Sequence, residues 1–265
     1  MSRYAANLSM LFPNLAFLRR FDAAASAGFD TVEFWWTTPS DLEGRSLDRF
    51  ASDVAATGLK VGLINFDGGD LAAGERGLAS DPTRIGRFRE SVPRAIELAS
   101  RLGCRKLNAL AGNLVADQSA QVQLDILADN VAAAAEQAST AGIVVLLEVL
   151  NRVDAPHYLL HDSSGALGFI ERLARPNVRF QLDVYHLGMG GEDSAAVIRA
   201  AGSMVGHVQF ADVPGRHEPG TGRLDWGGIH RALREIGYHD VIGLEYAPSD
   251  PSTCDLSFPD RFGGL

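Results

Sequence analysis

IVVLLE at residues 143–148 and VRFQLD at residues 178–183 are two short apolar runs, and each of them ends on a carboxylate. Both have the length and composition of a buried strand. Between them, residues 164–174 carry apolar side chains at spacings of three and four, which is typical of an amphipathic helix. The stretch therefore predicts a strand, a crossover helix and a second strand parallel to the first.

The same alternation runs along the whole chain. Several amphipathic segments end at a glycine, at Gly28, Gly103, Gly142 and Gly237, where glycine favours the end of a helix. Eight repeats over 265 residues favour a closed (β/α)8 TIM barrel over an open doubly wound sheet, and no GxGxxG motif follows the first strand. No linker divides the chain, so residues 1–265 are expected to form a single domain. The expected strands are 7–12, 31–35, 60–65, 106–110, 143–149, 178–183, 205–210 and 241–246, and the clearest helices are 15–27, 84–102, 120–141, 164–174 and 226–236.

The composition is that of an ordinary globular protein, with 46% hydrophobic and 22% charged residues. A formal net charge of −9 disfavours nucleic acid and an anionic membrane surface as partners. The only cysteines, Cys104 and Cys254, form no CxxC pair, which fits a reducing compartment. No segment has the pattern of a signal peptide or a membrane span, so a cytoplasmic protein is expected.

Polar side chains finish four of the expected strands. They are Glu148, Asp183, Gln209 and Glu245, and His186 follows Asp183 by about one helical turn. The carboxyl ends of barrel strands form the face that carries active sites. Converging carboxylates repel one another, and a divalent cation would relieve this repulsion; oxygen ligands favour Mg²⁺ or Mn²⁺ over zinc. The alternative for any one of these residues is a salt bridge with a nearby Arg or Lys.

Two of these carboxylates, Glu148 and Glu245, are expected on opposite sides of the cation. Such a pair can remove a proton from one carbon and deliver a proton to its neighbour, while the metal binds the oxygens of the enediolate formed between. This chemistry is aldose–ketose isomerisation or epimerisation.

Longer motifs surround these residues. They are DLAAGERG at 70–77, LAG at 110–112, PHYL at 156–159, QLD at 181–183 with His186, HVQFADVPGRHEPGTG at 207–222 and GLEY at 243–246. With them the chain resembles the hydroxypyruvate isomerase family, within the xylose-isomerase-like metal barrels that include the ketose 3-epimerases. The resemblance covers nearly the whole chain, and GRHEPGTG beside HVQ is its most specific part.

The resemblance implies site roles residue by residue. The family's metal ligands fall on Glu148, Asp183, Gln209 and Glu245, and Glu148 and Glu245 would also be the acid/base pair. His186 matches a histidine that touches a substrate oxygen, and Arg216 matches the loop arginine that reaches the substrate. Arg216, with Asn108 or His186, is expected to bind the substrate carboxylate or hydroxyls.

The substrate is also implied by the resemblance. It is a small hydroxy-keto acid, hydroxypyruvate converted to tartronate semialdehyde, with 2-oxo-tetronate isomerisation and ketose 3-epimerisation as the alternatives. One departure bears on substrate identity: FWWTTP at residues 34–39 replaces a Phe-Pro-Tyr type of segment. Of its adjacent tryptophans, Trp35 and Trp36, at most one can wall the pocket because neighbours on a strand point to opposite faces.

Other polar residues allow two interpretations each. His207 shares the inward face of Gln209, so it either supports the metal site from behind or packs in the core. Asn108 is either a pocket amide or a buried core polar group, and Glu33 is either a pocket carboxylate or a salt-bridge partner. Glu75 and Arg76 form a lid or a surface ion pair. His157 and His161 are expected to be surface or packing residues.

Two functions of other classes remain open. A metal-dependent phosphodiesterase of the endonuclease type uses a related barrel, but it would need several metals, more histidine ligands and a basic groove. A non-catalytic sugar-acid binding barrel would keep the ligands and lose turnover. For the isomerase or epimerase functions the expected partner is a small-molecule substrate, and assembly into a homo-oligomer is left open.

Overall fold

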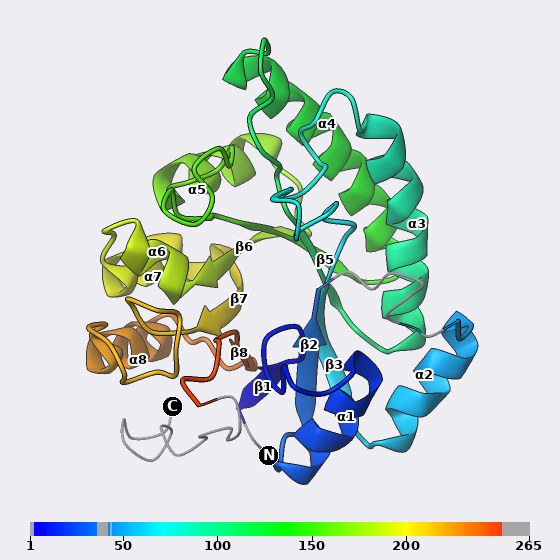
Figure 1. The fold of residues 1–265 in the computed structure, drawn as a ribbon. Coiled ribbons are helices and arrows are strands. Elements are labelled where there is room, and N and C mark those ends of the chain that lie inside the picture. Colours follow the sequence, from blue (N-terminus) through cyan, green and yellow to red (C-terminus); the bar gives the residue numbers. More distant parts are fainter. Residues whose placement is uncertain (1–2, 36–41, 43, 251–265) are drawn as a thin grey trace.

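Eight parallel strands close into a barrel in the computed structural model, which describes residues 3–35, 42 and 44–250. Each strand pairs with the next along the chain, and the last pairs with the first (Figure 1). The predicted (β/α)8 barrel is therefore confirmed. The strands are β1 (Tyr4–Asn7), β2 (Thr31–Phe34), β3 (Lys60–Asn65), β4 (Lys106–Ala109), β5 (Val144–Glu148), β6 (Val178–Asp183), β7 (Val205–Phe210) and β8 (Ile242–Leu244).

Helices surround the barrel, as Figure 1 shows. Several begin at a side chain that accepts a main-chain N–H, as Ser119 does from Val122 and Asp162 from Gly165. They are α1 (Phe17–Ser26), α2 (Leu47–Ala56), α3 (Ile85–Arg101), α4 (Ala120–Ser139), α5 (Ser163–Leu173), α6 (Val184–Met189), α7 (Ser194–Ala201) and α8 (Trp226–Glu235), with a 3₁₀ turn at Gly202–Met204. Within the described ranges, no helix is both long and apolar enough to cross a membrane.

The predicted boundaries are wrong at the first strand. The strand covers Tyr4–Asn7, not residues 7–12, so Asn7 lies at its carboxyl end. The main-chain N–H groups of Met10 and Leu11 both donate to the carbonyl of Asn7, which turns the chain sharply after the strand. Leu8 and Leu11 are buried in this turn, and their burial explains the strand-like apolar run. The last strand is also shorter than predicted, and Glu245 follows it directly.

The apolar core lies between the strands and the surrounding helices. Phe17 and Phe21 from α1 pack edge to face against Phe34 of β2, with ring centroids 5.6 and 5.8 Å apart. Phe50 of α2 completes this cluster. The helical shell therefore carries much of the hydrophobic packing, and this leaves the inward positions of the strands available to other side chains.

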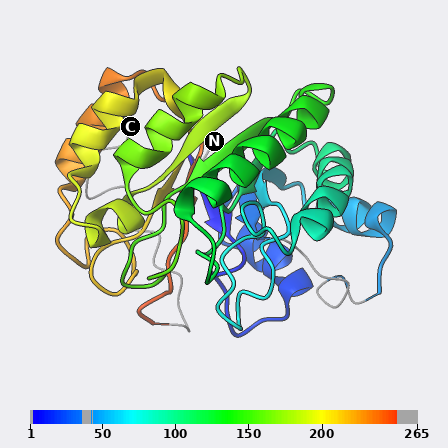
Figure 2. The same ribbon diagram turned by 90° about the horizontal axis from the view of Figure 1, so that it is seen from above.

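The barrel carries an unusual number of buried polar side chains. A barrel interior is usually filled by branched aliphatic residues. Here ten polar residues on or next to the strands are each at most 6% exposed: Asn7, Glu33, Asn65, Asn108, Glu148, Gln181, Asp183, His207, Gln209 and Glu245. Burying so many polar groups is costly unless they bond to one another or to a ligand. The long loops that follow β1 and β3 lie on the same side of the molecule, blue and cyan in Figure 2.

Candidate active site

A cavity of about 360 Å³ opens at the carboxyl ends of the strands. Its polar wall combines three carboxylates, two arginines and a histidine with an apolar side made of leucines. The lining residues are Trp35, Asn65, Leu71, Arg76, Leu110, Glu148, Leu150, Asp154, Ala155, Tyr185, His186, Arg216 and Glu245. A concave pocket with a few convergent polar groups is the usual form of a small-molecule site.

Three buried carboxylates dominate the electrostatics of this site: Glu148 and Glu245 of the cavity wall, and Asp183 at the end of β6. Burial, together with the charges of Glu245 and Asp183, raises the pKa of Glu148 well above its ordinary value. Burial likewise raises the pKa of Asp183 to about 7 and raises the pKa of Glu245, although Arg216 opposes both shifts. The guanidinium of Arg216 lies between two of them, with Nη2 3.2 Å from Asp183 Oδ2 and 2.7 Å from Glu245 Oε2. One guanidinium thus faces three carboxylates.

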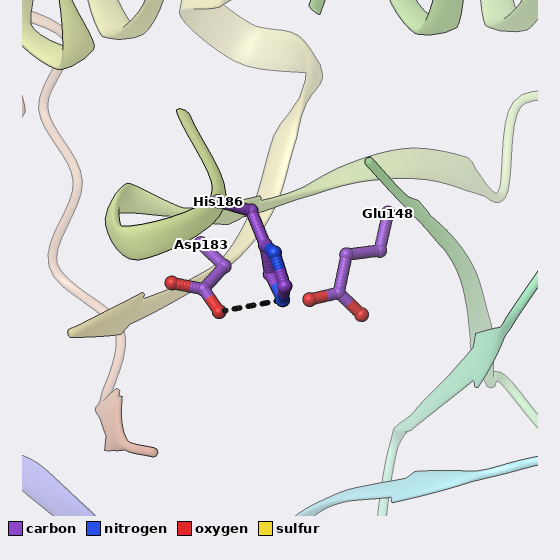
Figure 3. A group of neighbouring side chains, drawn as sticks. All are labelled: Glu148, Asp183 and His186. Carbon is purple, nitrogen blue, oxygen red and sulfur yellow. Dashed lines mark ion pairs between the residues drawn. The ribbon is translucent and has the colours of Figure 1, made fainter. Parts of the chain in front are cut away.

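The donor set fits a divalent cation. Glu148, Asp183 and His186 are buried, and each offers an atom within 4.8 Å of the others. Figure 3 shows the imidazole between the two carboxylates, which come from β5 and β6. In addition, two buried amide oxygens, Asn108 Oδ1 and Gln181 Oε1, accept no hydrogen bond from the described residues. Carboxylates and unpartnered amide oxygens are the kinds of ligand that a hard cation prefers.

Within this group of three, the hydrogen bonds of His186 make it a donor and not a metal ligand, so the carboxylates of Glu148 and Asp183 are the two that remain available to a cation. Its Nδ1 accepts from the main-chain N–H of Asn151 at 3.2 Å and from Asn151 Nδ2 at 2.8 Å. The orientation of that amide is fixed because Asn151 Oδ1 accepts from the N–H groups of Val153 and Asp154. Burial and the charges of Arg216 and Arg76 lower the pKa of His186 well below its ordinary value. His186 is therefore neutral, with its proton on Nε2, 3.6 Å from Asp183 Oδ2.

Glu33 forms a hydrogen-bonding hub beneath the carboxylates. This fully buried side chain accepts from Asn7 Nδ2 at 3.0 Å and from Gln209 Nε2 at 2.7 Å, and its Oε2 lies 2.7 Å from His207 Nε2. Asn7 Nδ2 also donates to Glu245 Oε1 at 3.0 Å. Glu33 does not line the cavity, and its contact with His207 is a hydrogen bond and not an ion pair, because burial and the charge of Lys106 lower the pKa of His207. Neither interpretation of Glu33 is therefore confirmed, and His207 belongs to the same network.

Gln209 lies at the end of β7, level with Asp183 on β6. Its Nε2 is directed to Glu33, and its Oε1 accepts from Gln181 Nε2 at 2.6 Å. An amide oxygen has a second lone pair, so this arrangement is compatible with ligation. The ligand role of Gln209 stays a prediction. So does the substrate role of Asn108, whose Nδ2 donates to Glu148 Oε2 at 2.8 Å.

The loop that carries Arg216 folds around Asp212. The carboxylate of Asp212 accepts from the main-chain N–H groups of Val213, Gly220 and Leu224 and from Trp226 Nε1. A side chain at Gly222 would meet the carbonyl oxygen of Val213 at 2.1 Å. Arg216 itself has a left-handed backbone, with φ 55°, which is uncommon outside glycine and concentrates at functional sites. The GRHEPGTG sequence thus forms a loop whose contacts hold Arg216 in place.

Some of the remaining predicted residues lie where they were expected, but the Glu75–Arg76 ion pair does not form among the described residues. Trp35 walls the cavity and donates Nε1 to Glu245 Oε1 at 2.7 Å. Trp36 and the rest of the 36–39 segment lie outside the described residues. His157 is exposed, and His161 contacts Arg152 and Asp162. Glu75 does not pair with Arg76, because its carboxylate binds Arg84 Nη1 at 2.8 Å.

Several site residues were not predicted from the sequence. Asn151 and Asp154 follow β5 and hydrogen-bond each other. The guanidinium carbon of Arg216 lies 5.0 Å from the centroid of the Tyr185 ring. Gln181 donates a hydrogen bond to Gln209. A signal existed for Gln181, because it precedes Asp183 by two residues as His207 precedes Gln209. The period of two places both members of each pair on the inner face of the barrel.

We expect Gly243→Ala to destabilise the protein. A Cβ at Gly243 would lie 2.3 Å from Glu33 Oε1 and 2.4 Å from Oε2, so the buried carboxylate would have to move. Overpacking of this kind costs roughly 1–3 kcal/mol, measured as the free energy of unfolding in urea. Gly86→Ala in α3 is the matched control, because nothing lies within 4 Å of its added Cβ. Equal unfolding free energies for the two variants would contradict the placement of Glu33.

Comparisons with known proteins give matches over nearly the whole chain. The family model described as xylose isomerase-like TIM barrel matches residues 21–257. A Streptomyces coelicolor protein of the hydroxypyruvate isomerase type is 39% identical, over 97% of this chain and 95% of its own. The 2-oxo-tetronate isomerase of Cupriavidus necator is 36% identical, over 97% of each chain. The hydroxypyruvate isomerase of Escherichia coli is 35% identical, over 99% of this chain and all of its own.

Solved structures show the same architecture. A Brucella melitensis structure described as an AP endonuclease of family 2 superposes with a TM-score of 0.89 at 36% identity, over 98% of this chain and 99% of its own. An L-ribulose 3-epimerase superposes with a TM-score of 0.73 at 27% identity, over 97% and 85%. The matches thus extend over essentially the full barrel, and relatives named as isomerases or epimerases recur among them.

Proposed function

The chain belongs to the hydroxypyruvate isomerase family of xylose isomerase-like TIM barrels, and from this membership we propose that it is a metal-dependent isomerase of a short hydroxy-keto acid. The first candidate substrate is hydroxypyruvate, with tartronate semialdehyde as its product. The observation that carries the proposal is the pair Glu148 and Glu245, both of which line one cavity with a neutral His186 and with Arg216. A four-carbon 2-oxo acid is the next candidate.

The reaction removes a proton from one carbon and adds a proton to the neighbouring carbon, with no net oxidation. One glutamate removes a proton from the hydroxymethyl carbon of the substrate, and the electron pair forms an enediolate with the adjacent carbonyl carbon. The other glutamate delivers a proton to that former carbonyl carbon, and the hydroxyl proton moves from one oxygen to the other. Burial raises the pKa values of Glu148 and Glu245 in the metal-free site, which favours their role as proton acceptors and donors.

A divalent ion, Mg²⁺ or Mn²⁺, would be held by Glu148, Asp183, Gln209 and Glu245. When bound, it would stabilise negative charge that develops on the substrate oxygens. Of the protein's own groups, His186 presents its Nε2–H to a substrate oxygen. Arg216, a fifth exposed, is placed to bind a second oxygen between Asp183 and Glu245.

A substrate panel tests the proposal. We expect hydroxypyruvate and 2-oxotetronates to be isomerised with a higher kcat/KM than free ketoses, measured by following product formation under saturating Mg²⁺ or Mn²⁺. Turnover of ketoses alone would make the chain a 3-epimerase. Saturable binding of keto acids without uptake of solvent deuterium would indicate a non-catalytic binding barrel.

Phosphodiester cleavage belongs in the same panel because of the name of the Brucella structure. Endonucleases of this barrel type would need several metals, whereas one group of three neighbouring acidic or histidine side chains is found in the described ranges. The net charge of −9 also disfavours DNA. We expect no cleavage of duplex DNA that contains an abasic site, and such cleavage at rates above keto-acid turnover would overturn the isomerase proposal.

A further inference from the structure

We propose that Arg76, in the loop between β3 and α3, binds the carboxylate of the substrate and thereby selects keto acids over uncharged ketoses. The inference rests on the proposed function, because it names the group that recognises the acid. It also assigns different roles to the two arginines that line the cavity: Arg76 binds the carboxylate, and Arg216 binds an oxygen at the reacting end of the substrate.

Arg76 has no carboxylate partner in the part of the chain that the structure describes. Two acidic residues of its loop form ion pairs elsewhere, since Asp67 binds Arg87 at 2.7 Å and Glu75 binds Arg84 at 2.8 Å, and the other two, Asp70 and Asp81, accept hydrogen bonds from Ala73 and Thr83. Arg76 hydrogen-bonds two main-chain carbonyls instead, those of Leu71 at 2.9 Å and Glu75 at 2.8 Å. No ion pair of Arg76 is found among residues 3–35, 42 and 44–250. A partly buried cation without a counter-ion is an expected partner for an anionic ligand.

This uncompensated charge faces the cavity. Arg76 lines it together with Glu148 and His186, and its charge contributes to lowering the pKa of His186. The other lining arginine, Arg216, already bonds Asp183 and Glu245. A substrate carboxylate is repelled by the three site carboxylates. Arg76 is thus the lining cation that no described carboxylate has already engaged.

The guanidinium is also held in a suitable orientation. Both carbonyl contacts use Nη1, which leaves Nε and Nη2 without a described partner. These two nitrogens form one edge of the guanidinium, and that edge matches a carboxylate in a bidentate pair.

The backbone next to Arg76 is fixed against the chain that directly follows β4. Gly77 has φ +106°, and a Cβ there would lie 2.2 Å from the carbonyl oxygen of Leu110. Its N–H donates to the carbonyl of Gly68 at 2.8 Å. A fixed backbone and an anchored guanidinium reduce the entropy lost on binding, so the affinity for an anion is greater.

The test compares acidic and neutral probes in the full-length enzyme. We expect Arg76→Gln to lower kcat/KM for hydroxypyruvate by about 10²-fold or more, mainly through KM, because two charge-assisted hydrogen bonds are lost. Arg76→Lys should recover part of the loss, since it restores the charge but not the bidentate edge. Calorimetric binding of D-glycerate should weaken in parallel. Inhibition by dihydroxyacetone, a neutral three-carbon probe, should stay within about twofold of wild type.

Arg84→Gln is the matched control. It removes the ion pair between Arg84 and Glu75 in the same loop, and it removes no charge from the cavity wall. An equal loss for glycerate and dihydroxyacetone in Arg76→Gln, or the same acid-specific loss in Arg84→Gln, would overturn the inference. So would an unchanged KM. If the wild type binds glycerate through Arg76 but does not turn over hydroxypyruvate, the proposed function fails and the inference stands. If the wild type binds no glycerate, both fail.

Discussion

Replacing either Glu148 or Glu245 with Gln is expected to lower kcat by about 10²- to 10⁴-fold, because an amide can neither accept nor deliver the proton at the reacting carbon. The new side chain keeps the shape of the carboxylate and one oxygen that can face a metal. Turnover is measured with hydroxypyruvate, and proton transfer is measured separately as deuterium uptake from ²H₂O. Glu97→Gln, an exposed residue of α3, is the control and should retain full activity.

The two variants should differ in stability. Glu148 Oε2 accepts from Asn108, whose own Oδ1 has no described partner, so a rotation of the Asn108 amide can satisfy the new NH₂ group. Glu245 is surrounded by donors: Oε1 accepts from Asn7 and Trp35, and Oε2 accepts from Arg216. An amide there places a donor against a donor, which costs roughly 1–3 kcal/mol of unfolding free energy. A variant that folds, binds metal and keeps near-normal turnover would remove that residue from proton transfer.

The strands could be predicted because each is a short apolar run bounded by turns. β5 and β6 agree with the prediction to within one residue. β1 does not, because buried leucines in a turn have the same local pattern as a strand, and the turn depends on hydrogen bonds to the Asn7 carbonyl. Local sequence cannot distinguish the two cases.

Part of the site could likewise be predicted from the sequence, and part of it could not. Charged residues that end apolar strands are visible in the sequence, and this brought Glu148, Asp183 and Glu245 together correctly in one buried group. The hub beneath them depends on cross-strand register. The register shifts between Val32 and Glu33 and between Phe180 and Gln181, and these irregularities set which inward side chains lie level with one another. Such shifts leave no local pattern, so the contacts of Glu33 required the structure.

Removal of divalent metal is expected to abolish activity, and Mg²⁺ or Mn²⁺ is expected to restore it. Without a cation, three buried carboxylates share one guanidinium, and the site must hold protons to limit their repulsion. The protein is treated with a chelator and desalted, and turnover is then measured during titration with each metal. Zn²⁺ should restore less activity, because the predicted ligands are all oxygen donors.

The pKa of Asp183 gives this experiment a second readout. With a pKa of about 7 in the absence of metal, Asp183 is largely protonated below pH 7, and the proton must leave when the cation binds. Metal affinity should therefore weaken as the pH falls below about 7, by up to about tenfold per unit, and calorimetry in buffers of different ionisation enthalpy should detect proton release. Asp183→Asn is the matched variant: its amide oxygen can still accept the N–H of Tyr185 at the start of α6, yet it cannot titrate. It should bind metal weakly and without this pH dependence. Full activity of the metal-free wild type would refute the metal requirement, because the carboxylates would then be shown to work with Arg216 alone.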